Sequence, residues 1–424
     1  MPYSEISNNI RRNKGINRYV LLFILSVGLH KLNYLIDEVS GLNIQESLGF
    51  TLLVFPFLFL FLAYLKAQTL TNFNPWVASF HVRFIIIYTF FLLLYGRIAG
   101  NSSMYLDELW TAFIVFFSYK LGALDSVWNL FRGKIVWVYL IFACFVLLAT
   151  QYKQKEIAYG NYDLQKFEGN TVTSEAYNVS PILDFWPLIF LINLYSYKKG
   201  FWIKFVTYLP LVIYLLFQIY FLKRAPTGRV IFYLIVSFVV LLYINKSYSR
   251  NFGLIISLLI GLFIFYSFIP EDLVERFYTE DKSRQVELVG MLSNLNSVEV
   301  FFGKGLGGEF LVGGDGVSER LNKYGREVKS TLHIGIGDAI LKGGLVLFFA
   351  IFSHVFVALK FGLSNIKRIN NIGLTAFVFL LVFTIFRLIE GGLTPGAVFN
   401  AFGFGLSLGA LDRQRISGIR SSDL

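Results

Sequence analysis

Cysteine is almost absent from this sequence. The chain has 424 residues and one cysteine, Cys144, which lies inside an apolar run and is predicted to be a core residue. A single cysteine excludes an intrachain disulfide and a cysteine-rich metal cluster. Charged residues are also scarce, at 15% of the chain, whereas apolar residues make up 55% and aromatic residues 18%. This composition predicts an all-α polytopic membrane protein.

Three further patterns are missing. The first apolar run follows the basic stretch from Arg11 to Arg18 and lacks a small-residue cleavage site, which favours a retained span over a cleaved signal peptide. The two halves of the chain show no internal repeat, which weakens the hypothesis of a transporter built from repeated halves. The segments predicted to lie outside contain no clear Asp-x-Asp or His-x-x-x-His metal pattern, although Asp37 and Glu38 form an acidic pair there.

Long apolar runs define the membrane domain. A helix needs about 20 apolar residues to cross the hydrocarbon core of a bilayer. On this criterion we predict about twelve transmembrane helices within one integral membrane domain covering residues 1–424. The predicted spans lie near residues 17–36, 49–66, 77–98, 109–124, 135–152, 181–197, 201–221, 230–245, 253–269, 333–358, 371–389 and 397–411.

The distribution of Lys and Arg predicts the orientation. These residues collect at the N-terminus, in the short segments after the even-numbered spans and in the C-terminal tail. Because such segments resist translocation, both termini are predicted to be cytoplasmic. Topology therefore explains the net charge of +11, which argues against nucleic acid as a partner.

Two loops on the outer side are long. Residues 153–180 form the smaller one, and residues 270–332 form a larger, partly helical one. The larger loop contains an amphipathic stretch at 286–292 and a glycine-rich stretch at 302–308. After it, Gly343 and Gly344 are expected to keep the next helix thin, so that another helix or a prenyl chain can approach closely.

Cations gather on this outer side, against the positive-inside tendency. The short turn at 221–229 alone carries three, and the end of the eleventh span adds another beside a glycine-rich segment. The candidate residues are Arg224, Arg229, Arg276, Arg284, Arg387 and His333. The alternative interpretation is that these arginines meet anionic lipid headgroups or carboxylates such as Glu275 and Glu287.

This set of side chains suits a particular chemistry. The planar guanidinium of arginine donates paired hydrogen bonds to phosphate oxygens and stays charged at any relevant pH. Histidine titrates near neutrality and can take a proton from a hydroxyl group. We therefore predict transfer of a sugar from a lipid diphosphate to an alcohol. His333 would act as the base, while the arginines stabilise the departing diphosphate without a metal.

The same features resemble a known family. The span number, the arginine that opens a mid-chain helix, the arginine early in a large outer loop, the Gly-x-Gly element and the histidine before a glycine-bearing helix are similar to those of the superfamily of O-antigen ligases and Wzy-type O-antigen polymerases. The motifs cover roughly residues 224–344, and the topology covers the whole chain.

The resemblance implies a GT-C-like, inverting, metal-independent and cofactor-free glycosyltransferase of the bacterial inner membrane, with its active site on the periplasmic side. Arg229 and Arg284 would contact the undecaprenyl diphosphate, with Arg224, Arg276 and Arg387 as further candidates, and His333 would assist the acceptor hydroxyl. Gly305 and Gly307 match the glycine element of the family. Donor and acceptor would both be lipid-linked oligosaccharides, and a chain-length regulator protein is a candidate partner.

Three alternatives remain open. An O-antigen ligase shares the same parts, but we favour a polymerase because polymerases of this superfamily are commonly this rich in phenylalanine. A flippase for the lipid-linked repeat unit suits twelve spans but does not need a loop of about sixty residues. A metal-dependent glycosyltransferase would place Asp37 and Glu38 near a divalent ion.

Overall fold

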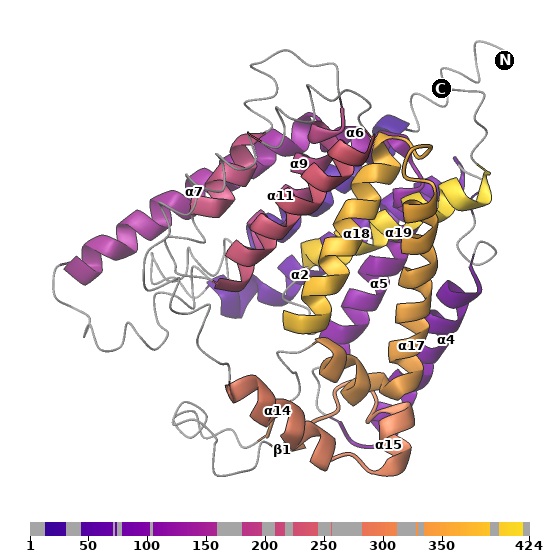
Figure 1. Cartoon of the computed structure of the whole chain (residues 1–424). Helices are drawn as coiled ribbons and strands as arrows, with labels where there is room; N and C mark the ends of the chain where they lie inside the picture. The colour runs from indigo at the N-terminus through magenta and orange to yellow at the C-terminus, as the bar shows by residue number, and fades with distance from the viewer. Residues whose placement is uncertain are drawn as a thin grey trace.

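The protein is a helical bundle, described by a computed structural model (Figure 1). The structure describes residues 13–30, 44–70, 73, 79–101, 105–158, 180–196, 208–216, 224–244, 256, 282–311, 328–329, 335–390 and 398–418. Within these residues, the prediction of an all-α protein is confirmed, apart from a two-residue antiparallel ladder that pairs Phe310 with Lys329 and Leu311 with Val328.

Helices make up nearly all of the described chain. Residues 13–30 and 208–216 are helical, and the labelled elements are α2 (Ile44–Gln68), α4 (Phe80–Ile98), α5 (Tyr105–Gly122), α6 (Asp125–Leu130), α7 (Lys134–Ala158), η2 (Ser180–Phe185), α9 (Trp186–Leu194), α11 (Arg224–Ile244), α14 (Lys282–Ser293), α15 (Ser297–Phe302), β1 (Phe310–Leu311), β2 (Val328–Lys329), α17 (Gly335–Ser364), α18 (Asn371–Glu390) and α19 (Val398–Ile416).

Three stretches of helix are long and apolar enough to cross a membrane. They are Phe80–Ile98, Thr227–Ile244 and Ile336–Ser364, and shorter apolar helices accompany them. Large apolar side chains such as Ile87, Leu94 and Val239 are exposed on these stretches. Such a surface suits hydrocarbon, because a helix satisfies its own backbone groups and leaves only apolar side chains to face lipid. Twelve spans remain a prediction.

Cys144 is not a core residue. It lies on α7, and its side chain is exposed. Its neighbours Ile141, Phe145 and Leu148 on the same helix are also exposed. The apolar run that predicted burial therefore includes a helix face that the described part of the protein leaves uncovered.

Small residues bring α5 and α19 together at the centre of the bundle. A Cβ atom at Gly405 would overlap Ser118, and one at Gly409 would overlap the carbonyl oxygen of Tyr119. Glycine at these positions lets the two backbones touch, which is a common way of packing helices without a hydrophobic driving force. Phe23, Phe399 and Phe402 pack beside this contact with ring centroids 5.0 to 6.5 Å apart.

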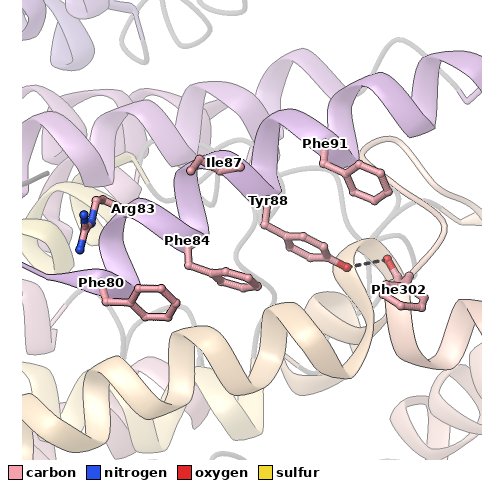
Figure 2. A pocket seen from close by; sticks show the side chains of 7 residues that line it. All are labelled: Phe80, Arg83, Phe84, Ile87, Tyr88, Phe91 and Phe302. Carbon is pink, nitrogen blue, oxygen red and sulfur yellow. Dashed lines mark hydrogen bonds between the residues drawn. The ribbon is translucent and has the colours of Figure 1, made fainter.

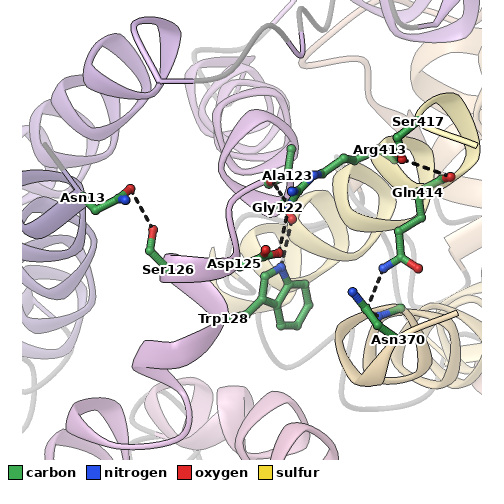
Figure 3. Close-up of polar contacts among 11 residues, drawn as sticks. Asn13, Gly122, Ala123, Asp125, Ser126, Trp128, Asn370, Arg413, Gln414 and Ser417 are labelled. Atoms are coloured by element: carbon green, nitrogen blue, oxygen red, sulfur yellow. Dashed lines mark hydrogen bonds and ion pairs between the residues drawn. The ribbon is translucent and has the colours of Figure 1, made fainter. Parts of the chain in front are cut away.

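The bundle has two distinct ends (Figure 1). Helices α14 and α15 lie at one of them, which we call the loop end. The other is the α6 end, where Arg413 donates hydrogen bonds to the carbonyl of Ala123 at 2.6 Å and to Asp125 at 2.8 Å (Figure 3). At the same end Gln414 donates to the Asn370 side chain at 2.8 Å. These bonds join the end of α19 to α6 and to the start of α18.

Helix α17 is broken near the loop end. Gly344 has φ 64° and ψ −171°, a conformation that is essentially restricted to glycine. The break removes helical partners from two carbonyls of the preceding turn, since an α-helix bonds each carbonyl to the amide four residues later. The glycine-rich segment supplies new donors: Lys304 N bonds to Leu341 O at 2.8 Å and Gly305 N bonds to Lys342 O at 3.0 Å.

Substitution of Gly344 tests the importance of this break. We expect Gly344→Ala to lower the stability of the protein by about 2 kcal/mol or more, because the residue needs a positive φ and its new Cβ would overlap the carbonyl of Phe301. The measurement is thermal unfolding in detergent. Gly100→Ala is the matched control, since Gly100 also has a positive φ of 74° but has nothing within 4 Å of the position of a Cβ. Equal losses in the two variants would contradict the proposed contact with α15.

Candidate active site

Arg229 lies in the second turn of α11, at the loop end of that helix. The helix begins at Arg224, and Pro226 falls in its first turn, where the missing amide donor is tolerated. Thr227 is fully buried and Arg229 is partly buried. The positive charge of Arg229 acts on the hydroxyl group of Tyr214, from the helix of residues 208–216. Arg229, the arginine predicted to be functional at the start of this helix, therefore has a side chain that points into the protein.

Asp184 is the acidic residue of this site. Its two carboxylate oxygens have separate donors: the Tyr214 hydroxyl donates to Oδ1 at 3.1 Å, and Asn400 Nδ2 donates to Oδ2 at 3.1 Å. The three side chains come from η2, the helix of residues 208–216 and α19. Sequence reasoning missed Asp184 and Asn400. The available signal was their position within the apolar stretches 181–192 and 397–411, where a polar side chain needs a partner.

An aromatic wall keeps this polar group in place. Trp186 lies 5.3 Å from Tyr214 and 5.3 Å from Tyr233, measured between ring centroids. Phe185 packs against Phe399, with ring centroids 5.0 Å apart. In the chain, Phe185 directly follows Asp184 and Phe399 directly precedes Asn400. Closely packed rings have few alternative rotamers, so the Asp184 carboxylate and its donors Tyr214 and Asn400 are held in place. Low polarity around them also strengthens the interaction of Arg229 with any anion that reaches it.

The end of α18 that carries Arg387 meets the same part of α11. Phe386 packs against Phe232, with ring centroids 5.6 Å apart. Phe386 directly precedes Arg387, and Phe232 lies three residues after Arg229, so the two arginine-bearing helix ends are neighbours. The structure thus brings together the backbone positions of two predicted arginines. Arg224 opens the same helix, α11.

Arg284 lies on α14, at the loop end of the bundle (Figure 1). This helix is held by a small apolar cluster in which Met291 of α14 packs with Phe310 and Leu341. The contact ties α14 to the part of α17 that precedes its break. Arg276 and His333 lie outside the described residues, as do Asp37 and Glu38.

The glycine element has a structural role. The amides of residues 304–306 donate to the carbonyls of Leu341, Lys342 and Leu92, and the Gly308 amide donates to Gly305 O. A backbone cradle for phosphate needs amides that point to the ligand. These amides already have protein acceptors, so the glycine-rich segment anchors the outer loop to α4 and α17.

Gly305 and Gly307 fit that anchoring role. Their φ values are 82° and 73°, and a Cβ at Gly305 would lie 2.7 Å from the amide nitrogen of Gly96 on α4. Asn101 completes the anchor by donating to the carbonyls of Lys304 and Leu306, each at 2.9 Å. The prediction of a close approach by another segment holds at Gly344, where a Cβ would overlap the carbonyl of Phe301 at the end of α15, whereas a Cβ at Gly343 would meet Leu347 of the same helix.

Lys342 also serves the anchor. Spacing alone predicts an ion pair between Asp338 and Lys342, four residues apart on one helix. The structure shows that Lys342 Nζ donates to the carbonyl of Gly308 at 2.9 Å, and that both Asp338 and Lys342 are buried. A buried ammonium group bonded to a backbone carbonyl fixes the end of the glycine-rich segment.

An apolar groove of about 560 Å³ runs along α4 beside the anchor (Figure 2). Its lining residues are Phe80, Arg83, Phe84, Ile87, Tyr88, Phe91 and Phe302. The Tyr88 hydroxyl donates to Phe302 O at 3.2 Å and to Gly343 O at 3.0 Å, so its polar atom is used within the protein. The lining suits a hydrocarbon chain and offers little for the recognition of a sugar.

Metal ligands do not gather in the described part of the chain. No group of three or more histidine, cysteine, aspartate or glutamate side chains could hold an ion there.

Comparison with family models, curated proteins and solved structures finds no match to this chain. The functional argument therefore depends on the residues and their geometry.

The bonds to Asp184 can be tested by a double-mutant cycle. We expect Asp184→Ala and Tyr214→Phe each to lower stability by about 1 kcal/mol, and the double variant to lose less than the sum, because both changes remove the same hydrogen bond. The measurement is thermal unfolding in detergent. Tyr208→Phe is the matched control on the same helix, where Tyr208 packs on Phe190 at 5.9 Å. Additive losses for Asp184 and Tyr214 would contradict a direct bond.

Proposed function

We propose that the protein is a polysaccharide polymerase of the O-antigen type. It transfers a glycan from undecaprenyl diphosphate to the terminal sugar hydroxyl of another lipid-linked repeat unit. The observation that carries the proposal is the convergence of Arg229, the Asp184 network and the Arg387-bearing end of α18 at one end of an apolar bundle. A cation fixed in this position suits a lipid diphosphate, whose tail stays in the hydrocarbon while its charge enters the protein.

The proposed reaction needs two kinds of group. Arg229, with Arg284 and Arg387 as further donors from α14 and α18, binds the diphosphate and stabilises the negative charge that grows on it as the glycosidic bond breaks. His333 takes the proton of the acceptor hydroxyl, and the anomeric carbon inverts. Asp184 holds the hydroxyl of Tyr214, on which the charge of Arg229 acts.

The proposed location is the bacterial inner membrane, with the loop end on the periplasmic side. The three membrane-length helices support a membrane location. The distribution of Lys and Arg supports the orientation, because Arg413 and Arg415 of the basic tail lie at the opposite, α6 end. Donor and acceptor would then approach laterally from the outer leaflet, beside α14.

Replacement of Arg229 tests the proposed role. We expect Arg229→Lys to reduce long-chain polysaccharide by at least about tenfold, because a point charge does not reproduce the paired hydrogen bonds of a guanidinium. The measurement is gel analysis of surface glycan in a strain that depends on the variant for polymer synthesis. Arg83→Lys, at an exposed arginine on α4, is the matched control and should leave the product unchanged.

His333→Ala should abolish the same product while the protein still accumulates in the membrane. Normal polymer from either Arg229→Lys or His333→Ala would overturn the assignment of that residue.

The product of a strain lacking the protein distinguishes polymerase from ligase. We expect lipid A core that carries a single repeat unit, because the unpolymerised unit can still be transferred. Bare core with accumulated lipid-linked polymer would instead identify a ligase. The analysis combines gel separation of lipopolysaccharide with extraction of undecaprenyl-linked glycans.

A further inference from the structure

A second polar cluster lies at the α6 end, away from Arg229. Its centre is Asp412 of α19, which is fully buried. His354 Nε2 of α17 lies 2.7 Å from Asp412 Oδ2, and the Tyr119 hydroxyl of α5 donates to the same oxygen at 2.6 Å. Arg415 Nε donates to Oδ1 at 2.9 Å. Three helices thus meet at one carboxylate in the interior of an apolar bundle.

The bonds define where the protons are. A carboxylate only accepts hydrogen bonds, so His354 Nε2 carries the hydrogen that faces Asp412. Arg415 already balances the charge of Asp412 with one positive charge. A proton added to His354 would therefore bring a second positive charge into the cluster, next to that of Arg415.

His81 of α4 adds a second titratable ring. It is partly exposed and stacks on the buried His354, with ring centroids 5.5 Å apart and an angle of 19° between the planes. The charged groups that act on His81 are His354 from α17 and Asp412 and Arg415 from α19. Tyr119 of α5 faces the same His354 ring at 5.9 Å. The two rings are in direct contact, so a positive charge on one repels a positive charge on the other.

The stacking of His81 on His354 is also one of the contacts that hold α4 against α17. At the loop end Tyr88 and Leu92 of α4 pack with Leu347 of α17, and the Tyr88 hydroxyl bonds to Gly343 and Phe302. At the α6 end His81 and His354 meet ring against ring. Two positive charges on stacked rings repel, and Arg415 adds to that repulsion.

We propose that His81 and His354 form a proton-binding site: Asp412 stabilises the first proton on the pair, and the second drives the first turns of α4 away from α17. The ligand is a proton from the aqueous phase at the α6 end, which reaches His81 first because that ring is the exposed member. The inference does not depend on the proposed glycosyltransferase function.

The distance between the two helices tests the site. Spin labels are attached to Arg83→Cys on α4 and Lys360→Cys on α17, two exposed positions near the pair, in a Cys144→Ser background of the full chain in lipid nanodiscs. Double electron–electron resonance then compares the distance at about pH 7.5 and about pH 4.5, so that the lower pH lies well below the ordinary histidine pKa of about 6.5. We expect a longer distance at the lower pH.

Variants of the pair supply the decisive comparison. His81→Phe keeps a stacked ring without a charge, so the distance should match the unsubstituted His81 protein at the higher pH and should not increase at the lower one. His81→Gln, which removes both ring and charge, should also show no increase. His30→Phe removes a histidine from the helix of residues 13–30 and should leave the increase intact. A constant distance in the protein with His81 intact, or an equal increase in His81→Phe, would overturn the proposal.

Discussion

The hydrogen bonds between the glycine-rich segment and the broken turn of α17 are the interaction on which the loop end depends. Gly344 interrupts the helix, the carbonyls of Leu341 and Lys342 lose their helical amide donors, and the amides of Lys304 and Gly305 donate to them instead. Unpaired backbone groups are costly in an apolar environment, so the break and the segment stabilise each other. The position of α15, and of the α14 helix before it, follows from this exchange of partners.

The same principle governs the charged side chains. Asp184 accepts bonds from Tyr214 and Asn400, and Asp412 lies within reach of His354, Tyr119 and Arg415. Each carboxylate receives bonds from more than one helix, which offsets the cost of removing it from water. One cluster lies toward the loop end and the other at the α6 end. Helices α4 and α17 run between the two ends and are joined at both of them.

Much of the fold follows from the composition. An apolar chain with basic segments at regular intervals predicts membrane helices, and the described residues are helical almost throughout. Arg229 was predicted because three cations in one short outer turn are unusual, and that residue proves to point inward. Asp184 and Asn400 escaped prediction because each is a single polar residue in an apolar stretch, and only packing reveals that their side chains meet. The glycine element was expected near a ligand, but its amides bond to helix carbonyls.

The sequence by itself determined the helical, apolar character of the protein, because a long apolar run satisfies its own backbone hydrogen bonds within one segment only as a helix. It also determined which glycines could adopt special backbone conformations. Only the tertiary structure decided which polar groups become partners. Residues such as Asp184 and Asn400, or Tyr119, His354 and Asp412, lie on helices far apart in the chain, and the approach of those helices depends on small residues and ring packing at many contacts. Local periodicity carries no information about that approach.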